Sequence, residues 1–305
     1  MQIYIQNKLS MLSILIPTYN YNAFPLVEEL YKQASLAGIP FEVRCIDDAS
    51  SSFDVENKKI NLLAHCNYRK LPENIGRSKI RNLLAQEAQF DWLLFLDVDV
   101  IPKSQEFIAA YIPYLNDKIK TVNGGICYQE VKPEKNKVFR WLYGKNREAK
   151  PCLERQINPY VSFLTLNFLI HKSIFSVVKF NESIPNLRHE DTLFSYDLKK
   201  NNIIVEHIDN PVYHLGLDTF DVAIKKENES IIALKHLLDN QLIDPNYIKI
   251  SKVFSIVNKL KLTQVFGVFY VITKKLFLKN LSSNKPSLFV FDLYRLGYIC
   301  KLNNN

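Results

Sequence analysis

The sequence is poor in glycine and cysteine, and each shortage excludes a class of protein. Only eight of the 305 residues are glycine, against sixteen tyrosines and nineteen phenylalanines. Such a chain is expected to pack densely rather than to consist of long loops, and it contains no internal repeat of fixed period. The five cysteines are scattered without the close pairs of a zinc site or a disulfide framework. A reducing cytoplasm therefore fits best.

Long hydrophobic runs and the pattern of a signal peptide are also missing. The longest apolar stretch, LTQVFGVFYVIT at 262–273, has twelve residues, whereas a membrane-spanning helix needs about 20. The first residues, MQIYIQNKLSM, do not place an apolar segment after a basic one. We therefore expect a cytoplasmic protein without a membrane-spanning helix.

Residues 1–240 have no excess of charge of either sign, because they hold 29 basic and 29 acidic side chains. The whole net charge of +8 comes from residues 241–305, which hold ten Lys and Arg against two Asp and Glu. A neutral body argues against a general nucleic-acid-binding surface, and the basic tail is expected to meet an anionic partner. We expect a globular domain at 1–240 and a basic, amphipathic helical extension at 241–305.

Short apolar runs alternate with helical patterns along the first half of the chain. The expected helices have apolar residues at the i, i+3, i+4 spacing. Expected strands are 13–17, 41–46, 65–71, 92–96 and 121–126, and expected helices are 23–38 and 77–89. The alternation predicts an α/β fold, in which helices cover both faces of a mostly parallel sheet. Ligands of such sheets bind at the carboxyl ends of the strands, so polar residues just after the apolar runs are the candidates for a site.

Two groups of candidates follow the first two strands. In PTYN, Pro17 ends the strand and Tyr19 could stack on a nucleobase, while Asn20 could open the next helix as its N-cap. In IDDAS, Asp48 either stabilises a turn through its own hydrogen bonds or accepts hydrogen bonds from a base or a ribose. Its position at a strand end favours the second interpretation.

A third group, LDVDV, ends an apolar run with two carboxylates. Asp97 and Asp99 flank one residue, so in an extended chain both face the same side, about 6–7 Å apart. Nothing basic stands beside them in the sequence, and two like charges this close are unfavourable without a cation. Carboxylates select hard cations such as Mg²⁺ or Mn²⁺, which also bind substrate phosphates. The stretch therefore indicates a site for a metal and a nucleotide.

Further ionisable residues each have two interpretations. Arg77, near the start of a predicted helix, either binds a phosphate or forms a solvated face with Arg81. Glu190 and Asp191, in HEDTLFSYDLKK, either stabilise a helix start electrostatically or include a general base. His214, in a turn after a predicted strand, is either a packed core histidine or a metal ligand.

The ordered set of motifs resembles family 2 glycosyltransferases with the GT-A fold. The motifs are IPTYN, IDDAS, ENIGRSKIRN, LDVDV, HEDTLFSYDLKK and VYHLG. The resemblance covers roughly residues 11–240 and, more weakly, the tail. The resemblance implies inverting transfer of a sugar from a nucleoside diphosphate sugar, with Mn²⁺ or Mg²⁺ bound. The roles that it implies are nucleotide binding for Pro17, Tyr19, Asp48, Arg77 and Asp97, metal binding for Asp99 and His214, and base catalysis for Asp191 beside Glu190.

The sequence departs from the family pattern in informative ways. Arg188 precedes HED where related sequences commonly have a small residue, often glycine, so the acceptor side is expected to differ in shape or charge. No QxxRW motif follows the acidic pair, which favours the addition of one sugar over polymer synthesis. The charged and aromatic segment 128–155 is either an acceptor-side loop that orders on binding or a solvated excursion.

The expected donor is a UDP-sugar, and the expected acceptor is a glycan or lipid-linked hydroxyl in cell-surface polysaccharide synthesis. Two other functions compete with this one. A sugar nucleotidyltransferase usually has a glycine-rich, basic loop after the first strand, whereas PTYNYNAFP contains no glycine. A non-catalytic protein that binds nucleotide sugars would have a similar site without turnover.

The extension at 241–305 also has two interpretations. Helices over about 246–280 would place Phe254, Val257, Leu260 and Phe266 beside several lysines. Such a face can lie on an anionic membrane surface, where lipid-linked acceptors are within reach. Alternatively, the face packs on the catalytic domain or on a second subunit. We predict peripheral contact of a cytoplasmic protein with the inner face of the membrane.

Overall fold

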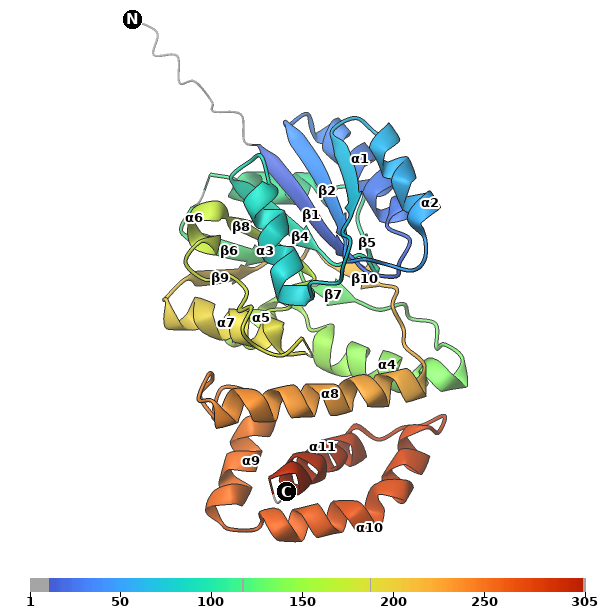
Figure 1. Ribbon diagram of the computed structural model, residues 1–305, viewed down its shortest axis with the longest axis vertical. Coiled ribbons are helices and arrows are strands. Elements are labelled where there is room, and N and C mark those ends of the chain that lie inside the picture. The colour runs from blue at the N-terminus through green and yellow to red at the C-terminus, as the bar shows by residue number, and fades with distance from the viewer. Residues whose placement is uncertain (1–10, 117, 187, 304–305) are drawn as a thin grey trace, which may run out of the picture.

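The computed structural model describes residues 11–116, 118–186 and 188–303, and its centre is a seven-stranded sheet with the order β3-β2-β1-β4-β8-β6-β9 (Figure 1). The strands are β1 (Leu12–Thr18), β2 (Phe41–Asp47), β3 (Cys66–Lys70), β4 (Trp92–Leu96), β6 (Lys120–Asn123), β8 (Asn167–His171) and β9 (Ile204–His207). Parallel pairing joins β3, β2, β1 and β4, while β8 runs antiparallel between β4 and β6. The predicted α/β fold with a mostly parallel sheet is confirmed.

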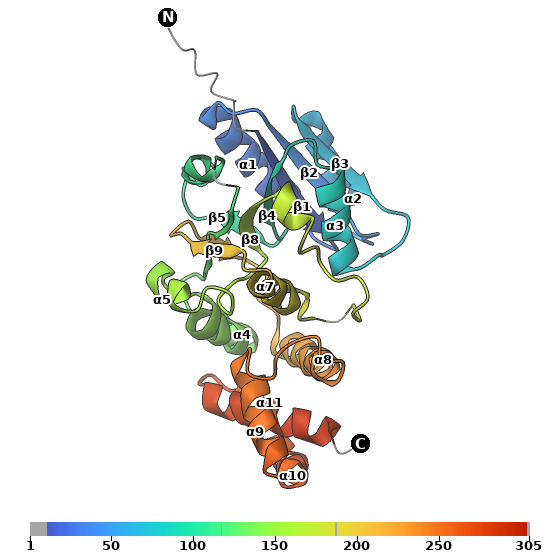
Figure 2. The same cartoon turned by 90° about the vertical axis from the view of Figure 1, so that its left-hand side faces the viewer.

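Helices cover both faces of this sheet (Figure 2). The α-helices of the described chain are α1 (Phe24–Ala37), α2 (Asp54–Lys58), α3 (Arg77–Glu87), α4 (Val138–Tyr143), α5 (Cys152–Ile157), α6 (Lys172–Phe175), α7 (Glu190–Lys200), α8 (Phe220–Asp239), α9 (Lys249–Lys259), α10 (Thr263–Leu281) and α11 (Leu288–Leu302). Successive strand residues point to opposite faces. In β4, Leu94 packs in one core cluster with Leu30 of α1, and Phe95 packs in another with Leu84 of α3. The continuous apolar run of β4 thus serves two cores.

Most of the strands in this part of the fold follow the sequence pattern. The structure forms β4 at the predicted 92–96. Strand β1 is one residue longer than predicted at each end, and β2 is one residue longer at its C-terminal end. The single strand predicted at 121–126 is wrong, because the chain leaves the large sheet after β6. Gly124 and Gly125 allow the chain to leave the sheet here, because neither has a side chain. A Cβ at Gly125, for example, would collide with the guanidinium of Arg155.

A second sheet of three strands, with the order β5-β10-β7, lies at the carboxyl edge of β4. Its strands are β5 (Val100–Pro102), β7 (Ile126–Cys127) and β10 (Val212–His214). In the antiparallel pairing of β10 with β5, His214 stands opposite Val100. His214 therefore lies in a strand and not in the predicted turn, and this register places it next to Asp99.

Helices α9, α10 and α11 lie on the far side of α8 from the large sheet (Figures 1 and 2). Phe254 and Val257 of α9 are buried in a cluster with Leu193 of α7 and Ile231 of α8. This part of the apolar face that the sequence assigns to the membrane packs inside the protein instead, while Leu260 is 62% exposed. Over the described ranges, no helix is long and apolar enough to cross a membrane.

Candidate active site

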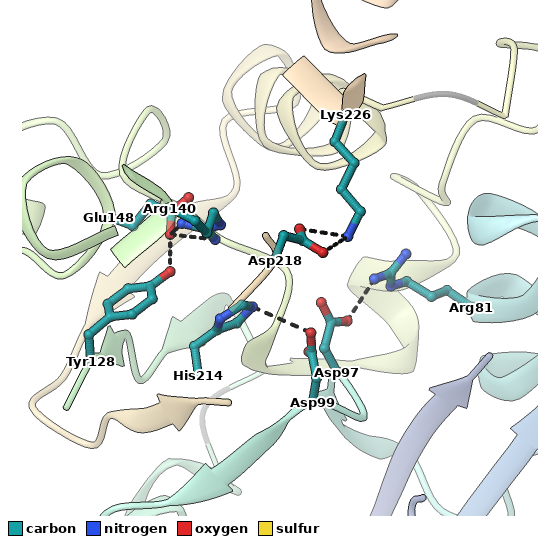
Figure 3. A network of polar contacts seen from close by, with 9 residues as sticks. All are labelled: Arg81, Asp97, Asp99, Tyr128, Arg140, Glu148, His214, Asp218 and Lys226. Atoms are coloured by element: carbon teal, nitrogen blue, oxygen red, sulfur yellow. Dashed lines mark hydrogen bonds and ion pairs between the residues drawn. The ribbon is translucent and has the colours of Figure 1, made fainter. Parts of the chain in front are cut away.

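Asp97 and Asp99 follow β4 directly, with their carboxylates close together (Figure 3). The sequence shows nothing basic beside them, but in the fold Arg81 Nη2 donates a hydrogen bond to Asp97 Oδ1 at 2.7 Å. Arg81 is 5% exposed, because it shares the buried face of α3 with Ile80 and Leu84. The buried Arg81 guanidinium, which is far from Asp97 in the sequence, therefore offsets the negative charge of this carboxylate.

Asp99 faces the histidine that the small sheet brings to it. His214 Nε2 lies 3.4 Å from Asp99 Oδ2, and the buried His214 Nδ1 has no hydrogen-bond partner in the part of the chain that the structure describes. Gly216 leaves room for this carboxylate, since a Cβ there would collide with Asp99 Oδ2. Burial raises the pKa of Asp99, and the charge of Asp97 adds to this shift while His214 opposes it. A cation beside Asp99 would stabilise its buried negative charge and would offset the repulsion from Asp97.

The chemistry around Asp99 fits a divalent cation that shares its coordination with a bound ligand. A carboxylate is an ordinary ligand of Mg²⁺ and Mn²⁺, and histidine is a common metal ligand. Within residues 11–116, 118–186 and 188–303, no group of three or more His, Cys, Asp or Glu side chains could hold a metal by itself. Protein sites for Mg²⁺ often supply one or two carboxylates and leave the other positions to water and substrate phosphates. Asp99 and His214 match such a partial set.

Asp48, after β2, ties this strand to the start of α3. Its Oδ1 accepts the backbone N–H of Ile75 at 2.7 Å, and its Oδ2 accepts that of Gly76 at 3.0 Å. The turn itself is stabilised by Asp47, whose Oδ1 accepts the N–H of Ser50 at 2.7 Å. Each oxygen of Asp48 keeps lone-pair capacity for one more donor. The carboxylate thus has a structural role and can still accept a hydrogen bond from a ligand.

Tyr19 and Asn20 lie beside that turn, just after β1. Asn20 is not the predicted N-cap, because its Oδ1 accepts the N–H of Ser51 at 2.8 Å and α1 begins later, after Ala23. Its φ of 49° is a left-handed conformation that asparagine tolerates. Pro17 lies within β1, and Tyr19 is 55% exposed. An exposed aromatic ring at this edge can stack on a planar ligand.

Glu190 and Asp191 form the first turn of α7, and the structure gives them different partners. Glu190 is 8% exposed, and its Oε1 lies 3.5 Å from Nη1 of Arg77 and 3.5 Å from Nη1 of Arg81. Asp191 Oδ1 accepts the N–H of Thr192 at 2.7 Å, and no described basic side chain lies at ion-pair distance from Asp191. Burial, together with the charge of Glu190, raises the pKa of Asp191 to about 6. Asp191 can therefore take up a proton near neutral pH.

A cavity of about 670 Å³ opens beside the start of α7. Its lining joins Asp191 to side chains of α4, α5, α8 and α11, among them Arg140 and Lys226, and to Arg188 just before α7. Much of segment 128–155 therefore forms helices that line this cavity, so this part is neither a loop nor a solvated excursion. The carboxylates that follow β4 do not line this cavity.

Several charged residues of the site are not singled out by the sequence analysis (Figure 3). Lys226 Nζ lies 2.7 Å from both carboxylate oxygens of Asp218, and Arg140 Nη1 lies 3.1 Å from Glu148 Oε2. No local pattern marks these pairs, because a separation of eight residues exceeds the i, i+3 and i, i+4 spacings at which charged pairs are recognised on a helix. Arg81 does carry a signal, since its helical position is on the apolar face, where an arginine requires a partner.

The chain is similar to known proteins in sequence and in fold. A family model described as glycosyl transferase family 2 matches residues 13–176. A curated protein of Haemophilus influenzae, described as an uncharacterized glycosyltransferase, is 26% identical over 245 residues, which cover 73% of this chain and 91% of that protein. A second protein of the same description and organism is 31% identical over 157 residues, which cover 47% of this chain and 52% of that protein.

Two solved structures are similar over most of the chain. S. aureus TarS 1–349 in complex with UDP-GlcNAc gives a TM-score of 0.50 at 16% identity, covering 96% of this chain and 92% of that chain. The mannosyltransferase PcManGT from Pyrobaculum calidifontis, in complex with GDP-Man and Mn²⁺, gives 0.54 at 11% identity, covering 96% and 88%. These likenesses confirm the predicted GT-A fold. Because the family model spans more than half of the sequence, the chain belongs to glycosyl transferase family 2.

Proposed function

We propose that this glycosyltransferase moves one sugar, with inversion, from a UDP-sugar to a hydroxyl of a glycan or lipid-linked acceptor, in cell-surface polysaccharide synthesis. The observation that carries the proposal is the separation of the carboxylates into two groups. Asp97 and Asp99 lie together after β4, while Asp191 lines the cavity with a raised pKa. One group suits the donor diphosphate with its metal, and the other suits the acceptor hydroxyl. The UDP-GlcNAc bound to TarS supports the choice of UDP.

The nucleotide would lie along the carboxyl edge of β1, β2 and β4. Tyr19 offers an exposed ring to the base beside Pro17, and Asp48 offers lone pairs to an N–H of the base. Asp97 is held in one orientation by its ion pair and would accept hydrogen bonds from the ribose or contact the diphosphate. Arg77, with a side chain 46% exposed at the start of α3, is placed for a phosphate.

The divalent metal, Mn²⁺ or Mg²⁺, is assigned to Asp99 and His214. When bound, the cation would stabilise the negative charge that gathers on the diphosphate leaving group. The pairing of β10 with β5 holds these two side chains together, and Gly216 keeps the space around Asp99 open. The Mn²⁺ in the PcManGT complex supports the assignment.

Asp191 would act as the general base. It would take the proton of the acceptor hydroxyl as that oxygen attacks the anomeric carbon on the face opposite the diphosphate, which inverts the configuration. A pKa near the working pH suits this role, and the negative charge of Glu190 helps to keep the pKa of Asp191 raised. Glu190 itself is held by Arg77 and Arg81, which fixes the first turn of α7.

We also propose that residues 241–305 are an extension of the catalytic domain at 1–240 and contact an anionic membrane. Helix α10 buries one face against α11 and exposes apolar side chains elsewhere, namely Val265, Val268, Phe269, Val271, Ile272 and Leu276. Exposed lysines accompany them at positions 261, 274, 275 and 279. Lysines attract anionic headgroups while apolar side chains enter the interface. Such contact would bring lipid-linked acceptors to the cavity that α8 and α11 line.

The donor assignment is tested by a thermal-shift screen of nucleotide sugars, with and without Mn²⁺. A ligand that binds the folded state alone raises its stability with the ratio of concentration to Kd. We expect one UDP-sugar to raise the melting temperature and to release UDP. A GDP-sugar that does so in its place would correct the choice of base.

The metal assignment is tested by Asp99→Ala in the same release assay. We expect the Mn²⁺-dependent release of UDP to be lost while the fold is retained. Release that survives this substitution would remove Asp99 from the metal site. Binding of a nucleotide sugar without release from any donor, with glycan and lipid acceptors supplied, would favour a non-catalytic nucleotide-sugar-binding protein.

A further inference from the structure

Arg188 stands just before α7 and lines the same cavity as Asp191. The residue is partly buried, its Nε is fully buried, and no described residue gives this nitrogen a hydrogen-bond partner. Arg188 forms no ion pair with a residue that the structure describes. The other arginines of the lining do have carboxylate partners, which pair Arg77 with Glu190, Arg140 with Glu148, Arg147 with Asp292 and Arg295 with Glu227.

This placement of Arg188 costs free energy unless a ligand supplies an acceptor. Burial lowers the pKa of its guanidinium, and the charge of Arg77 lowers it further. The carboxylates of Glu190, Asp218 and Asp191 oppose the shift from beyond ion-pair distance. Charged groups removed from water in proteins are as a rule paired or bound to a ligand. The donors of Arg188 are therefore available to a molecule in the cavity.

The cavity places Arg188 on the side of the acceptor. Asp99 and His214, which we assign to the metal, do not line it, whereas Asp191, the proposed base, does. An acceptor whose hydroxyl reaches Asp191 from the cavity thus shares this space with the Arg188 guanidinium. The exposed Lys249 also lines the cavity and adds to its positive potential.

We propose that Arg188 binds an oxyanion group of the acceptor, a phosphate or a carboxylate, and so selects acceptors that carry such a group near the reactive hydroxyl. This inference rests on the function proposed above, because it takes Asp191 as the base. A planar guanidinium matches two oxygens of either group with parallel hydrogen bonds, which lysine cannot reproduce. A small residue at this position could supply neither the charge nor the hydrogen bonds.

The test compares the affinity of the protein for three probe sugars, namely glucose, glucose 6-phosphate and glucuronic acid. Titration calorimetry gives the Kd of each for the wild type, for Arg188→Gln and for Arg188→Lys. We expect the wild type to bind at least one charged sugar roughly tenfold or more tightly than glucose, as a charge-assisted hydrogen bond predicts. Arg188→Gln should abolish this preference, and Arg188→Lys should retain part of it. The matched control is Lys200→Gln, which removes an exposed charge at the other end of α7 and should leave the preference intact.

The two charged sugars distinguish the two kinds of oxyanion. A preference for glucose 6-phosphate identifies a phosphate, and a preference for glucuronic acid identifies a carboxylate. Equal affinity for all three sugars, absence of measurable binding by both charged sugars, or a preference that survives Arg188→Gln would overturn the inference. A raised KM for the nucleotide sugar in Arg188→Gln, with the sugar preference unchanged, would assign the arginine to the donor and also overturn it. UDP release by the wild type reports on the proposed function separately. Selective binding of a charged sugar without UDP release from any donor would refute the proposed function but support the anion site.

Discussion

At the scale of single residues, Arg81 connects the two halves of the site. Its Nη2 donates to Asp97 after β4, and its Nη1 lies near Glu190 in the first turn of α7. One buried guanidinium thus fixes the Asp97 carboxylate relative to the turn that carries the proposed base. Local sequence patterns do not predict the pair with Asp97, because it joins residues sixteen positions apart on a helix and after a strand. The motif around Asp191, by contrast, is contiguous in the sequence, so the sequence alone marks this residue as a candidate.

Replacement of Arg81 by Met is expected to destabilise the protein. Both carboxylates would lose their buried partner, which should lower the free energy of unfolding by about 2–4 kcal/mol. Urea unfolding measures this change. The control is Arg69→Met, which removes an exposed ion pair with Glu87 and should cost less than about 1 kcal/mol. Equal losses in the two variants would show that Arg81 does not hold the site together.

The pH dependence of transfer should report the pKa of Asp191. A base must be deprotonated, and the folded-state pKa of Asp191 is raised to about 6, so kcat/KM should fall as the pH falls through this value. Glu190→Gln removes a negative neighbour that contributes to the raised pKa. The acidic limb of the pH profile should therefore move to lower pH in this variant. An acidic limb that stays in place would mean that another group controls it.

At the scale of secondary-structure elements, the turn after β10 sets the position of Asp99. Gly216→Ala would force a Cβ into the Asp99 carboxylate. We expect the fold to persist and sugar transfer to fall about 100-fold, since a displacement of about 1 Å at a reactive site can cost that much. Circular dichroism and steady-state kinetics separate the two effects.

Gly38→Ala is the control for this substitution. A Cβ at Gly38 meets nothing within 4 Å, but its φ of 66° disfavours alanine. This variant should lose stability of about 1 kcal/mol and keep its rate per folded molecule. A similar fall in rate for both variants would mean that the loss of transfer in Gly216→Ala does not come from the crowding of Asp99.

Helix α10 provides a prediction about the membrane. The double variant Val268→Asp and Ile272→Asp places charge on two side chains that are 60% and 74% exposed, one turn apart. In a flotation assay at low salt, the wild type should float with vesicles of phosphatidylcholine and phosphatidylglycerol, and the double variant should not. Ile204→Asp, at a 51% exposed position of β9, should float like the wild type. A wild type that stays in the soluble fraction would remove the membrane proposal.

The accuracy of the predicted elements has physical reasons. Strand β4 is found at its predicted residues, because its apolar run ends abruptly at Asp97. The split of 121–126 between two sheets depends on close contacts of Gly124 and Gly125 with residues far along the chain, which periodicity does not contain. No pattern predicts α11, because its sequence LFVFDLYRLGYICKL is apolar almost all round and shows no clear amphipathic period.

At the scale of the whole molecule, residues after 240 contribute to the lining of the cavity beside α7. Helix α11 lines the cavity together with α7 and α8, and α9 packs on α7 and α8 through Phe254 and Val257. The charge imbalance of residues 241–305 marks the extension in the sequence, but it does not show which of its apolar residues pack inward. Which apolar residues pack inward is determined by the way the C-terminal helices fold around α8. The cavity that we propose for the acceptor is therefore lined both by residues that precede 241 and by the C-terminal helix α11.

The central claim, that Asp191 is the base for transfer to an acceptor in this cavity, is tested most directly by Asp191→Asn. With donor, Mn²⁺ and acceptor supplied, the variant should bind the nucleotide sugar with an unchanged Kd, because Asp191 lies on the acceptor side. Its rate of sugar transfer should fall by about 10²–10⁴-fold, the usual contribution of a general base. Near-normal transfer by Asp191→Asn would contradict the claim and move the base to Glu190.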